Sequence, residues 1–335
     1  MPATEFLDTL ARRSLTERES YQTFIDILGG AMSDIEIAAL LVAMKTRGET
    51  AEEITGAALA MLDQARPFPR PAYRVADTCG TGGDNLGTVN ISTAAAFVAA
   101  AAGIPVAKHG NRASSSHAGS ADALESLGLD LDCPPDTARR ALDRAGVCFL
   151  FAPAYHPGVR QAATVRRTLR TRTVMNLLGP LVNPARPAWQ VMGVYAPHLV
   201  RPIAETLHRL GVSAALVVHG SGLDELALHG PTTAAFLRDG RIEDLVLTPE
   251  DAGLPRAPVG DLAGGDPAEN GLWLRRLLAG HGSSVHAAAV ALNAGALLWI
   301  ADRAGSLAEG TRLATAIIAE GAGAERLRLL LEEAA

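Results

Sequence analysis

Residues 73–108 constrain the fold more than any other part of the chain. Residues 73–77 are expected to form a short strand, residues 92–102 an alanine-rich helix closed by Gly103, and residues 105–108 a second strand. In a strand–helix–strand unit the two strands run parallel, because the chain must cross back over the sheet between them. The sequence therefore predicts an α/β domain with a central, mainly parallel sheet flanked by helices.

The same alternation continues towards the C-terminus. It predicts a helix at residues 120–127 and strands at residues 148–151 and 214–218, the last followed by His219 and Gly220. Between these strands, residues 159–172 form an arginine-rich stretch with helical character, and residues 176–184 are expected to form a loop. The chain contains no internal repeat.

The first 66 residues predict helices alone. A hydroxyl residue is followed three positions later by glutamate, the capping-box signature of a helix start, in three pairs: Thr16 with Glu19, Ser33 with Glu36, and Thr50 with Glu53. After the second box, the apolar residues recur at helical intervals, at Ile35, Ala38, Leu41 and Val42. Arg47 and Gly48 then end the helix. Prolines at 67, 69 and 71 favour an extended linker. We expect a small all-helical domain at residues 1–66 and an α/β domain at residues 73–335.

The composition excludes several classes of protein. Among 335 residues, 30 are basic and 36 acidic, and the two signs are interleaved, so the basic stripe that binds nucleic-acid backbones is missing. No apolar run approaches the roughly 20 uncharged residues that a bilayer span needs, and the acidic N-terminal segment does not fit a signal peptide. The 3 cysteines suit neither a disulfide framework nor a zinc site. We expect reduced thiols in a cytoplasmic protein without a membrane or nucleic-acid partner.

The segment of residues 77–93, D-T-C-G-T-G-G-D-N-L-G-T-V-N-I-S-T, carries the strongest chemical signal. Its glycines at 80, 82 and 83 permit positive φ and let backbone amides approach a ligand. Thr88, Ser92 and Thr93 lie where a helix leaves its first amides unpaired and its dipole is positive. A phosphate site is thereby favoured over a purely structural turn. The dinucleotide fingerprint fails at Asn85, where a third glycine belongs, and the Walker pattern lacks its Gly-Lys-Ser/Thr ending.

A second polar segment follows the next predicted strand. It consists of nine consecutive residues: Lys108, His109, Gly110, Asn111, Arg112, Ala113, Ser114, Ser115 and Ser116. Gly119 and Ser120 then open another helix. Two cations, an amide and several serines make a poor core and a good polyanion site. Parallel strands end at one edge of the sheet, where ligands bind, so the two segments are expected to lie close together.

Asp224 and Glu225 follow a third apolar strand, in G-S-G-L-D-E. Adjacent carboxylates most often mark a solvated turn. At the same sheet edge as two phosphate-binding segments, however, they are suited to Mg²⁺, which bridges one or two carboxylates to substrate phosphates.

The second substrate is expected to meet an arginine. Most arginines of residues 159–172 fit a solvated helix face, but one turned into the cleft would suit a carboxylate, and periodicity leaves the choice open among Arg160, Arg166, Arg167, Arg170 and Arg172. His109 and His156 are expected beside the site. Cys79 is expected to be a small packed residue and not a nucleophile.

Four motifs resemble one known family. G-T-G-G-D-x-x-x-T-x-N-x-S-T, K-H-G-N-R-x-x-S-S-x-x-G-S-A-D, N-L-L-G-P-L-x-N-P and G-L-D-E occur in the order and spacing of the anthranilate phosphoribosyltransferases, across nearly the whole chain. Residues 264–266 with Asn270, and residues 292–294, also look like this family.

The resemblance implies a fold and an activity. The fold would be of the class III nucleoside phosphorylase-like type, a homodimer formed through a small helical domain to which about residues 160–185 contribute. The reaction would move the phosphoribosyl group of 5-phosphoribosyl 1-pyrophosphate to the amine of anthranilate, giving N-(5-phosphoribosyl)anthranilate and pyrophosphate, in tryptophan biosynthesis.

The resemblance also implies site residues. Phosphoribosyl pyrophosphate would bind to the nine residues from Lys108 to Ser116 and to Gly80, Gly83, Asp84, Thr88, Asn90, Ile91, Ser92, Thr93 and Ser120. Anthranilate would contact Gly80, Asn111 and Arg166, and Mg²⁺ would be held by Ser92, Asp224 and Glu225. No residue of these motifs is implied as an acid, base or nucleophile.

Some positions depart from the family pattern, and two alternatives stay open. Met175 replaces a common phenylalanine, Gly158 a common alanine, and residues 280–286 lack an expected proline and Arg-Asp pair, which bears on the shape of the acceptor pocket. A pyrimidine nucleoside phosphorylase of the same fold would need a K-H-S-T-G-G loop, and a non-catalytic binding relative would show eroded motifs. The existence of a separate anthranilate synthase or glutamine amidotransferase partner is also left open.

Overall fold

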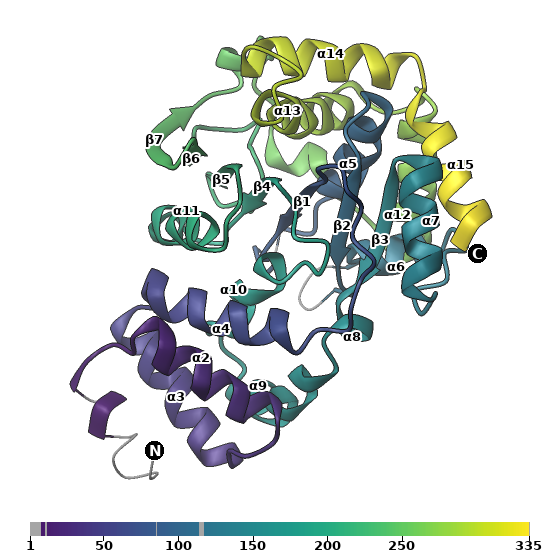
Figure 1. Cartoon of the computed structure of the whole chain (residues 1–335). Helices are drawn as coiled ribbons and strands as arrows, with labels where there is room; N and C mark the ends of the chain where they lie inside the picture. Colours follow the sequence, from purple (N-terminus) through teal and green to yellow (C-terminus); the bar gives the residue numbers. More distant parts are fainter. Residues whose placement is uncertain (1–7, 11, 85, 114–116, 335) are drawn as a thin grey trace.

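The computed structural model describes residues 8–10, 12–84, 86–113 and 117–334. A helical N-terminal domain lies below a larger α/β domain, with the N-terminus in the former and the C-terminus in the latter (Figure 1). Helices α2 (Glu17–Leu28), α3 (Asp34–Arg47) and α4 (Ala51–Asp63) follow the three expected capping boxes. In each, the hydroxyl accepts from the N3 amide while the glutamate accepts from the N-cap amide. All three predicted helix starts are confirmed.

Helix α3 buries a different face from the one that its apolar spacing suggested. Ile37, Leu40, Leu41 and Met44 are buried, whereas Ile35 is 82% exposed and Val42 is 42% exposed. The helix is apolar on several sides, so two sets of residues have helical spacing and the sequence does not single out the inward one. Of the residues predicted from spacing, only Leu41 is fully buried.

The α/β domain is built on a seven-stranded sheet with the order β3-β2-β1-β4-β5-β6-β7. Its strands are β1 (Ala76–Gly80), β2 (Val106–Gly110), β3 (Val147–Phe151), β4 (Trp189–Gly193), β5 (Ala214–Gly220), β6 (Thr232–Arg238) and β7 (Arg241–Leu247). The first five are parallel, and β6 and β7 add an antiparallel edge. The mainly parallel sheet is confirmed.

The first strand runs later than predicted. It begins at Ala76 instead of residue 73 and continues to Gly80, because its pairing with β4 extends over residues 76–80. The glycine segment therefore starts inside the sheet. Sequence propensity near residue 73 could not show where the partner strand begins, and strand ends are set by that partner.

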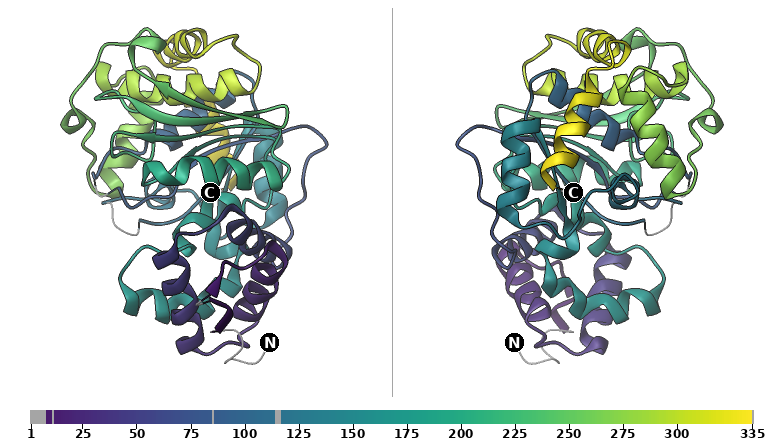
Figure 2. Two further views of the ribbon diagram at one scale, coloured as in Figure 1. Left: turned by 90° about the vertical axis from the view of Figure 1, so that its left-hand side faces the viewer. Right: turned by 90° about the vertical axis from the view of Figure 1, so that its right-hand side faces the viewer.

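Helices cover both faces of the sheet, as Figure 2 shows. They are α5 (Ile91–Ala101), α6 (Ser120–Glu125), α7 (Pro135–Ala145), α11 (Val200–Arg209), α12 (Pro267–Leu278), α13 (Ser284–Ile300), α14 (Leu307–Ala319) and α15 (Gly323–Ala334). Alternate strand residues serve two cores: Leu216 faces α5 and α13, while Met192 and Val217 face α11 and the helical domain. Among the described helices, none has the length and apolar character that crossing a membrane requires.

Residues 152–181 return from the sheet to the helical domain. They form α8 (Ala152–Tyr155), η1 (Pro157–Ala162), α9 (Ala163–Leu169), α10 (Met175–Leu178) and η2 (Gly179–Leu181). The helix expected over residues 159–172 is thus broken into a 3-10 turn and a short helix. The loop expected at residues 176–184 is partly wrong, since α10 and η2 occupy its first half. Ala162, Val165 and Leu177 share a core with α2, α3 and α4, and this packing outweighs the local turn signals.

Candidate active site

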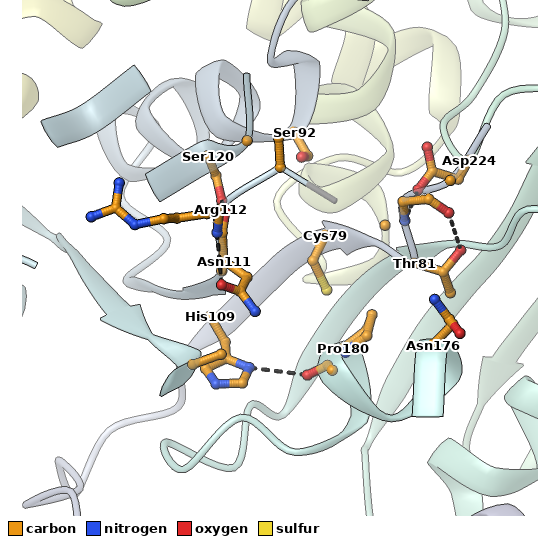
Figure 3. Close-up of a pocket in the computed structure, with 18 of the residues that line it drawn as sticks. Cys79, Thr81, Ser92, His109, Asn111, Arg112, Ser120, Asn176, Pro180 and Asp224 are labelled. Carbon is orange, nitrogen blue, oxygen red and sulfur yellow. Dashed lines mark hydrogen bonds between the residues drawn. The ribbon is translucent and has the colours of Figure 1, made fainter. Parts of the chain in front are cut away.

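A cavity of about 730 Å³ lies between the two domains, at the carboxyl ends of β1, β2 and β5. At β1 the strand order changes direction, since β2 and β3 follow on one side and β4 and β5 on the other. Open sheets bind ligands at such a point, because the loops on either side diverge and leave a crevice. Figure 3 shows Asp224 and Thr81 at one end of this cleft, Asn111 and Arg112 at the other, and Cys79 between them.

The glycine segment closes tightly on the acidic loop. A Cβ on Gly80 would lie 2.1 Å from Asp224 Oδ2, and the Gly82 amide donates to the same oxygen at 2.6 Å. Gly82 and Gly83 have φ of 68° and 83°, as expected for a glycine turn. The Thr81 amide donates to Gly193 O at 3.0 Å. Glycines therefore permit both the turn and the close approach of Asp224.

The N-terminus of α5 opens into the cleft. Its N-cap residue Asn90 does not cap the helix; its amide instead donates to Ala118 O and accepts from Asn270. Of the first amides, that of Ser92 donates to Glu225 Oε1 at 3.2 Å. A helix start without a side-chain cap leaves backbone donors directed at a ligand, which is the arrangement that binds phosphate.

The carboxyl groups of Asp224 and Glu225 are buried, and the pKa of each is raised. Asp224 is 9% exposed, burial raises its pKa to about 6, and the nearby charge of Asp84 adds to the shift. Burial raises the pKa of Glu225 to about 8, with a further contribution from Asp224. The positive charge of Lys108 lowers the pKa of Glu225 and so opposes the effects of burial and of Asp224. A divalent cation at this pair would relieve the repulsion between the carboxylates.

The two cations of the basic segment, Lys108 and Arg112, do not both point into the cleft. Lys108 is 3% exposed, and its ammonium donates to Thr78 O at 2.6 Å and Ser92 Oγ at 3.3 Å, so it lies beneath the start of α5. Arg112 is bidentate to Glu125, at 2.6 and 2.7 Å, and its side chain points away from the cleft centre in Figure 3. Lys108 thus supports the cleft from below, while the Arg112 guanidinium is engaged by Glu125.

Two neutral imidazoles form one wall. His109 Nδ1 donates to Gly179 O at 3.0 Å and His156 Nε2 to Val182 O at 2.9 Å, since a carbonyl oxygen only accepts. Burial lowers the pKa of His109 to about 3 and that of His156 to about 4. The rings meet edge to face with centroids 5.3 Å apart, and His109 Nε2 finds no partner among the described residues. Both histidines line the cavity, next to the residues that the sequence analysis expected at the site.

Arg166 is the arginine that reaches the cleft from α9. It lines the cavity together with Met175 and Asn176, and burial lowers the pKa of its guanidinium. None of the described residues forms an ion pair or side-chain hydrogen bond with it. Arg160 also lines the cavity, whereas Arg167 and Arg170 are exposed. Cys79 is buried, and burial raises the pKa of its thiol well above the usual value, as expected for a packed residue.

The cavity brings together all predicted site residues that the structure describes. They are Gly80, Gly83, Asp84, Thr88, Asn90, Ile91, Ser92, Thr93, Lys108, His109, Gly110, Asn111, Arg112, Ala113, Ser120, Arg166, Asp224 and Glu225. Ser114, Ser115 and Ser116 lie outside the described residues. Sequence reasoning gave no role to Asn183, whose amide donates to Asp77 Oδ2 and Ala107 O behind the cleft. Only its place in the N-L-L-G-P-L-x-N-P motif singled it out.

Comparison with known proteins decides the family. A glycosyl transferase family helical bundle domain matches residues 7–65, and a glycosyl transferase family a/b domain matches residues 72–324. An anthranilate phosphoribosyltransferase of Sorangium cellulosum is 59% identical over 313 residues, which cover 93% of this chain and 90% of the relative. One from Aeromonas salmonicida is 52% identical, with 95% of each chain covered. The chain belongs to the anthranilate phosphoribosyltransferase family.

Solved structures of anthranilate phosphoribosyltransferases support the same assignment. The enzyme from Thermus thermophilus matches with a TM-score of 0.94 and 45% identity, covering 99% of both chains. The Saccharomyces cerevisiae enzyme in complex with PRPP and Mg matches with a TM-score of 0.89 and 25% identity, covering 99% of this chain and 97% of the other. The whole architecture of the family is therefore present here.

Proposed function

We propose that this cleft transfers the phosphoribosyl group of 5-phosphoribosyl 1-pyrophosphate to the amine of anthranilate, releasing pyrophosphate, as a step of tryptophan biosynthesis. One observation carries the proposal: an uncapped helix start, a buried carboxylate pair and an arginine without an acidic partner all face the same cavity. These three features suit, in turn, a phosphate, a divalent cation and a carboxylate substrate.

The donor would occupy the crevice between the first two polar segments. Backbone amides at the start of α5 and in the glycine turn face the cavity, and Lys108 places its positive charge beneath them. Such fixed donors are worth most in a partly dehydrated cleft, because water does not compete with them. The donor-binding residues expected from the sequence, including Ser114, Ser115 and Ser116, are the proposed phosphoribosyl pyrophosphate site.

Ser92, Asp224 and Glu225 are the proposed ligands of Mg²⁺. The Ser92 amide donates to Glu225 Oε1, and Asp224 precedes Glu225 in the chain, so the three residues lie at the same edge of the cavity. The described residues contain no group of three acidic, histidine or cysteine side chains that could hold a metal ion. Two carboxylates nevertheless suit Mg²⁺, which keeps several waters and binds substrate phosphates. When bound, the ion would neutralise charge on the departing pyrophosphate.

The acceptor would lie against His109, His156 and Arg166. The Arg166 guanidinium is suited to the carboxylate of anthranilate, and Asn111 and Gly80 line the same cavity. The bond between ribose C1 and the pyrophosphate oxygen breaks and its electron pair leaves with that oxygen. The amine nitrogen bonds to C1 and loses its proton to water. With both imidazoles neutral and buried, the protein contributes positioning and charge stabilisation.

The arrangement of chains is also proposed. We assign residues 1–66, with helical contributions from about residues 160–185, to a helical domain, and residues 73–335 to the catalytic domain. Ile35 and Val42 are exposed on one side of α3, seven positions apart, as two turns of a helix place them. We propose that this face joins two copies into a homodimer. The cytoplasmic location inferred from the cysteines stays a prediction.

The test is the loss of anthranilate fluorescence when enzyme, phosphoribosyl pyrophosphate and Mg²⁺ are combined. Wild type should show loss that needs both the donor and the metal. The double variant Asp224→Asn, Glu225→Gln should lose about 100-fold or more of kcat/KM. A matched control, Glu243→Gln with Asp244→Asn, removes the same charges from the exposed strand β7 and should leave the rate unchanged. Pyrimidine release from nucleosides in phosphate, without anthranilate turnover, would instead favour a phosphorylase.

A further inference from the structure

Arg172 lies on the segment that returns from α9 to the cleft. The helix ends at Leu169, and Arg170 turns the chain with φ of 46°. The segment is fixed from both sides: the Lys45 ammonium of α3 bonds to the Thr171 hydroxyl, and the Thr173 amide donates to Asn176 Oδ1 at 3.0 Å. The position of Arg172 is therefore set by the helical domain.

The guanidinium of Arg172 reaches the α/β domain at the glycine turn. It lies 4.5 Å from the centroid of the Tyr195 ring, and a Cβ on Gly83 would be 3.2 Å from its Nε. Tyr195 is itself fixed, because its amide donates to Thr81 Oγ1 at 3.1 Å. Stacking on the ring holds the plane of the guanidinium and leaves its edge donors available.

No described residue supplies Arg172 with a hydrogen bond or an ion pair. Many other arginines of the chain are paired, as Arg112 is with Glu125 and Asp122, and Arg201 with Glu205, whereas Arg172 shares with Arg166 the lack of an acidic partner among the described residues. Arg172 is half-buried. Its guanidinium is held on a ring, has no acidic partner in the described part of the chain, and lies against Gly83, which lines the cavity, so it is suited to an anionic ligand there.

We propose that Arg172 is a binding residue for the pyrophosphate of the donor, brought to the glycine turn by the helical domain. The assignment rests on the proposed function. It favours the pyrophosphate over the acceptor carboxylate because Gly83 and the metal-site residue Asp224 lie at this end of the cleft. Figure 3 shows Thr81, Asn176 and Asp224 at that end. Arg166, from α9, is then left for the acceptor.

The assignment gives the helical domain a share in donor binding. Lys108 is supplied by β2 and the metal pair follows β5, so both belong to the α/β domain. Arg172 would add a planar, bidentate donor from the opposite side, which a pyrophosphate oxygen pair can accept. Pyrophosphate in the cleft would then connect the two domains, and its release would require breaking this contact.

The experiment titrates pyrophosphate with Mg²⁺ into the full-length protein by calorimetry and measures KM for each substrate. Arg172→Gln should weaken pyrophosphate binding about 10- to 100-fold, the loss expected for a charge-assisted hydrogen bond. In Arg172→Gln, KM for phosphoribosyl pyrophosphate should rise, whereas KM for anthranilate should stay at its wild-type value. Arg172→Lys keeps the positive charge but loses the planar pair of donors, so its affinity for pyrophosphate should lie between those of wild type and Arg172→Gln. Arg167→Gln, an exposed arginine on the same segment, is the matched control.

Two results would overturn the assignment. One is wild-type pyrophosphate affinity in an Arg172→Gln protein with an unchanged melting temperature. The other is an increase confined to KM for anthranilate, which would place Arg172 with the acceptor. If wild type turns over no anthranilate but binds pyrophosphate through Arg172, the proposed function fails while the anion-binding role stands.

Discussion

Replacing Gly193 with alanine is expected to displace the acidic pair. Gly193 ends β4, and a Cβ built there would lie 1.5 Å from the backbone oxygen of Asp224 and 2.2 Å from its carbonyl carbon. Both are backbone atoms, so no side-chain rotation relieves the clash. Ordinary contact requires a shift of about 2 Å in the loop that carries the proposed metal ligands. A displacement of about 1 Å can cost about 100-fold in rate, so kcat/KM should fall at least that far.

The same clash should lower stability. Overpacking of this kind costs about 1–3 kcal/mol, which for a domain of this class lowers Tm by roughly 2–12 °C. The assay combines thermal unfolding with the Mg²⁺ dependence of anthranilate turnover. Gly260→Ala is the control, because a Cβ at that exposed glycine meets nothing within 4 Å. Wild-type Tm and Mg²⁺ dependence in Gly193→Ala would show that the acidic loop does not depend on this approach.

Three further predictions concern the other parts of the site and the helical domain. Arg166→Gln should raise KM for anthranilate about 10- to 100-fold and leave KM for the donor unchanged, in steady-state assays that vary each substrate; equal effects on both would contradict the acceptor assignment. The pKa values of His109 and His156 are lowered from 6.5 to about 3 and about 4. As pH falls below 6.5, these histidines therefore bind protons in the unfolded chain but stay neutral in the folded protein. The free energy of unfolding should therefore fall by about 2 kcal/mol per histidine between pH 7 and pH 5, and His156→Asn should show a shallower fall of Tm over this range; parallel curves would contradict buried neutral rings. Ile35→Glu with Val42→Glu should halve the mass measured by light scattering after gel filtration, and an unchanged mass would place the dimer contact elsewhere.

Features encoded locally could be read from the sequence. Each capping box needs only two side chains three residues apart, so the starts of α2, α3 and α4 were predictable. The polar segments after β1, β2 and β5 could be grouped because parallel strands end at one edge of the sheet. This rule was enough to bring residues as distant as Gly80 and Asp224 into one predicted site.

Features set by distant partners could not be read in this way. The start of β1 depends on where β4 pairs with it, and the inward face of α3 depends on which neighbours cover it. Lys108 turns beneath α5 and Arg112 pairs with Glu125 through contacts that no local pattern contains. Of five arginines on one stretch, periodicity could not select Arg166, because the stretch is broken by the turn at Arg170.

The strand order also bears on how the chain is made. A ribosome adds roughly 5–20 residues per second, and 142 residues separate Gly82 from its partner Asp224, so synthesis of that interval takes about 7–28 s. Throughout the first part of it, β1 has β2 on one side and an open edge on the other, since β4 has not yet emerged. Open strand edges recruit other chains. Nascent chains that stall before residue 189 should therefore be the aggregation-prone species during expression, and slower initiation at low temperature should raise the yield of folded protein.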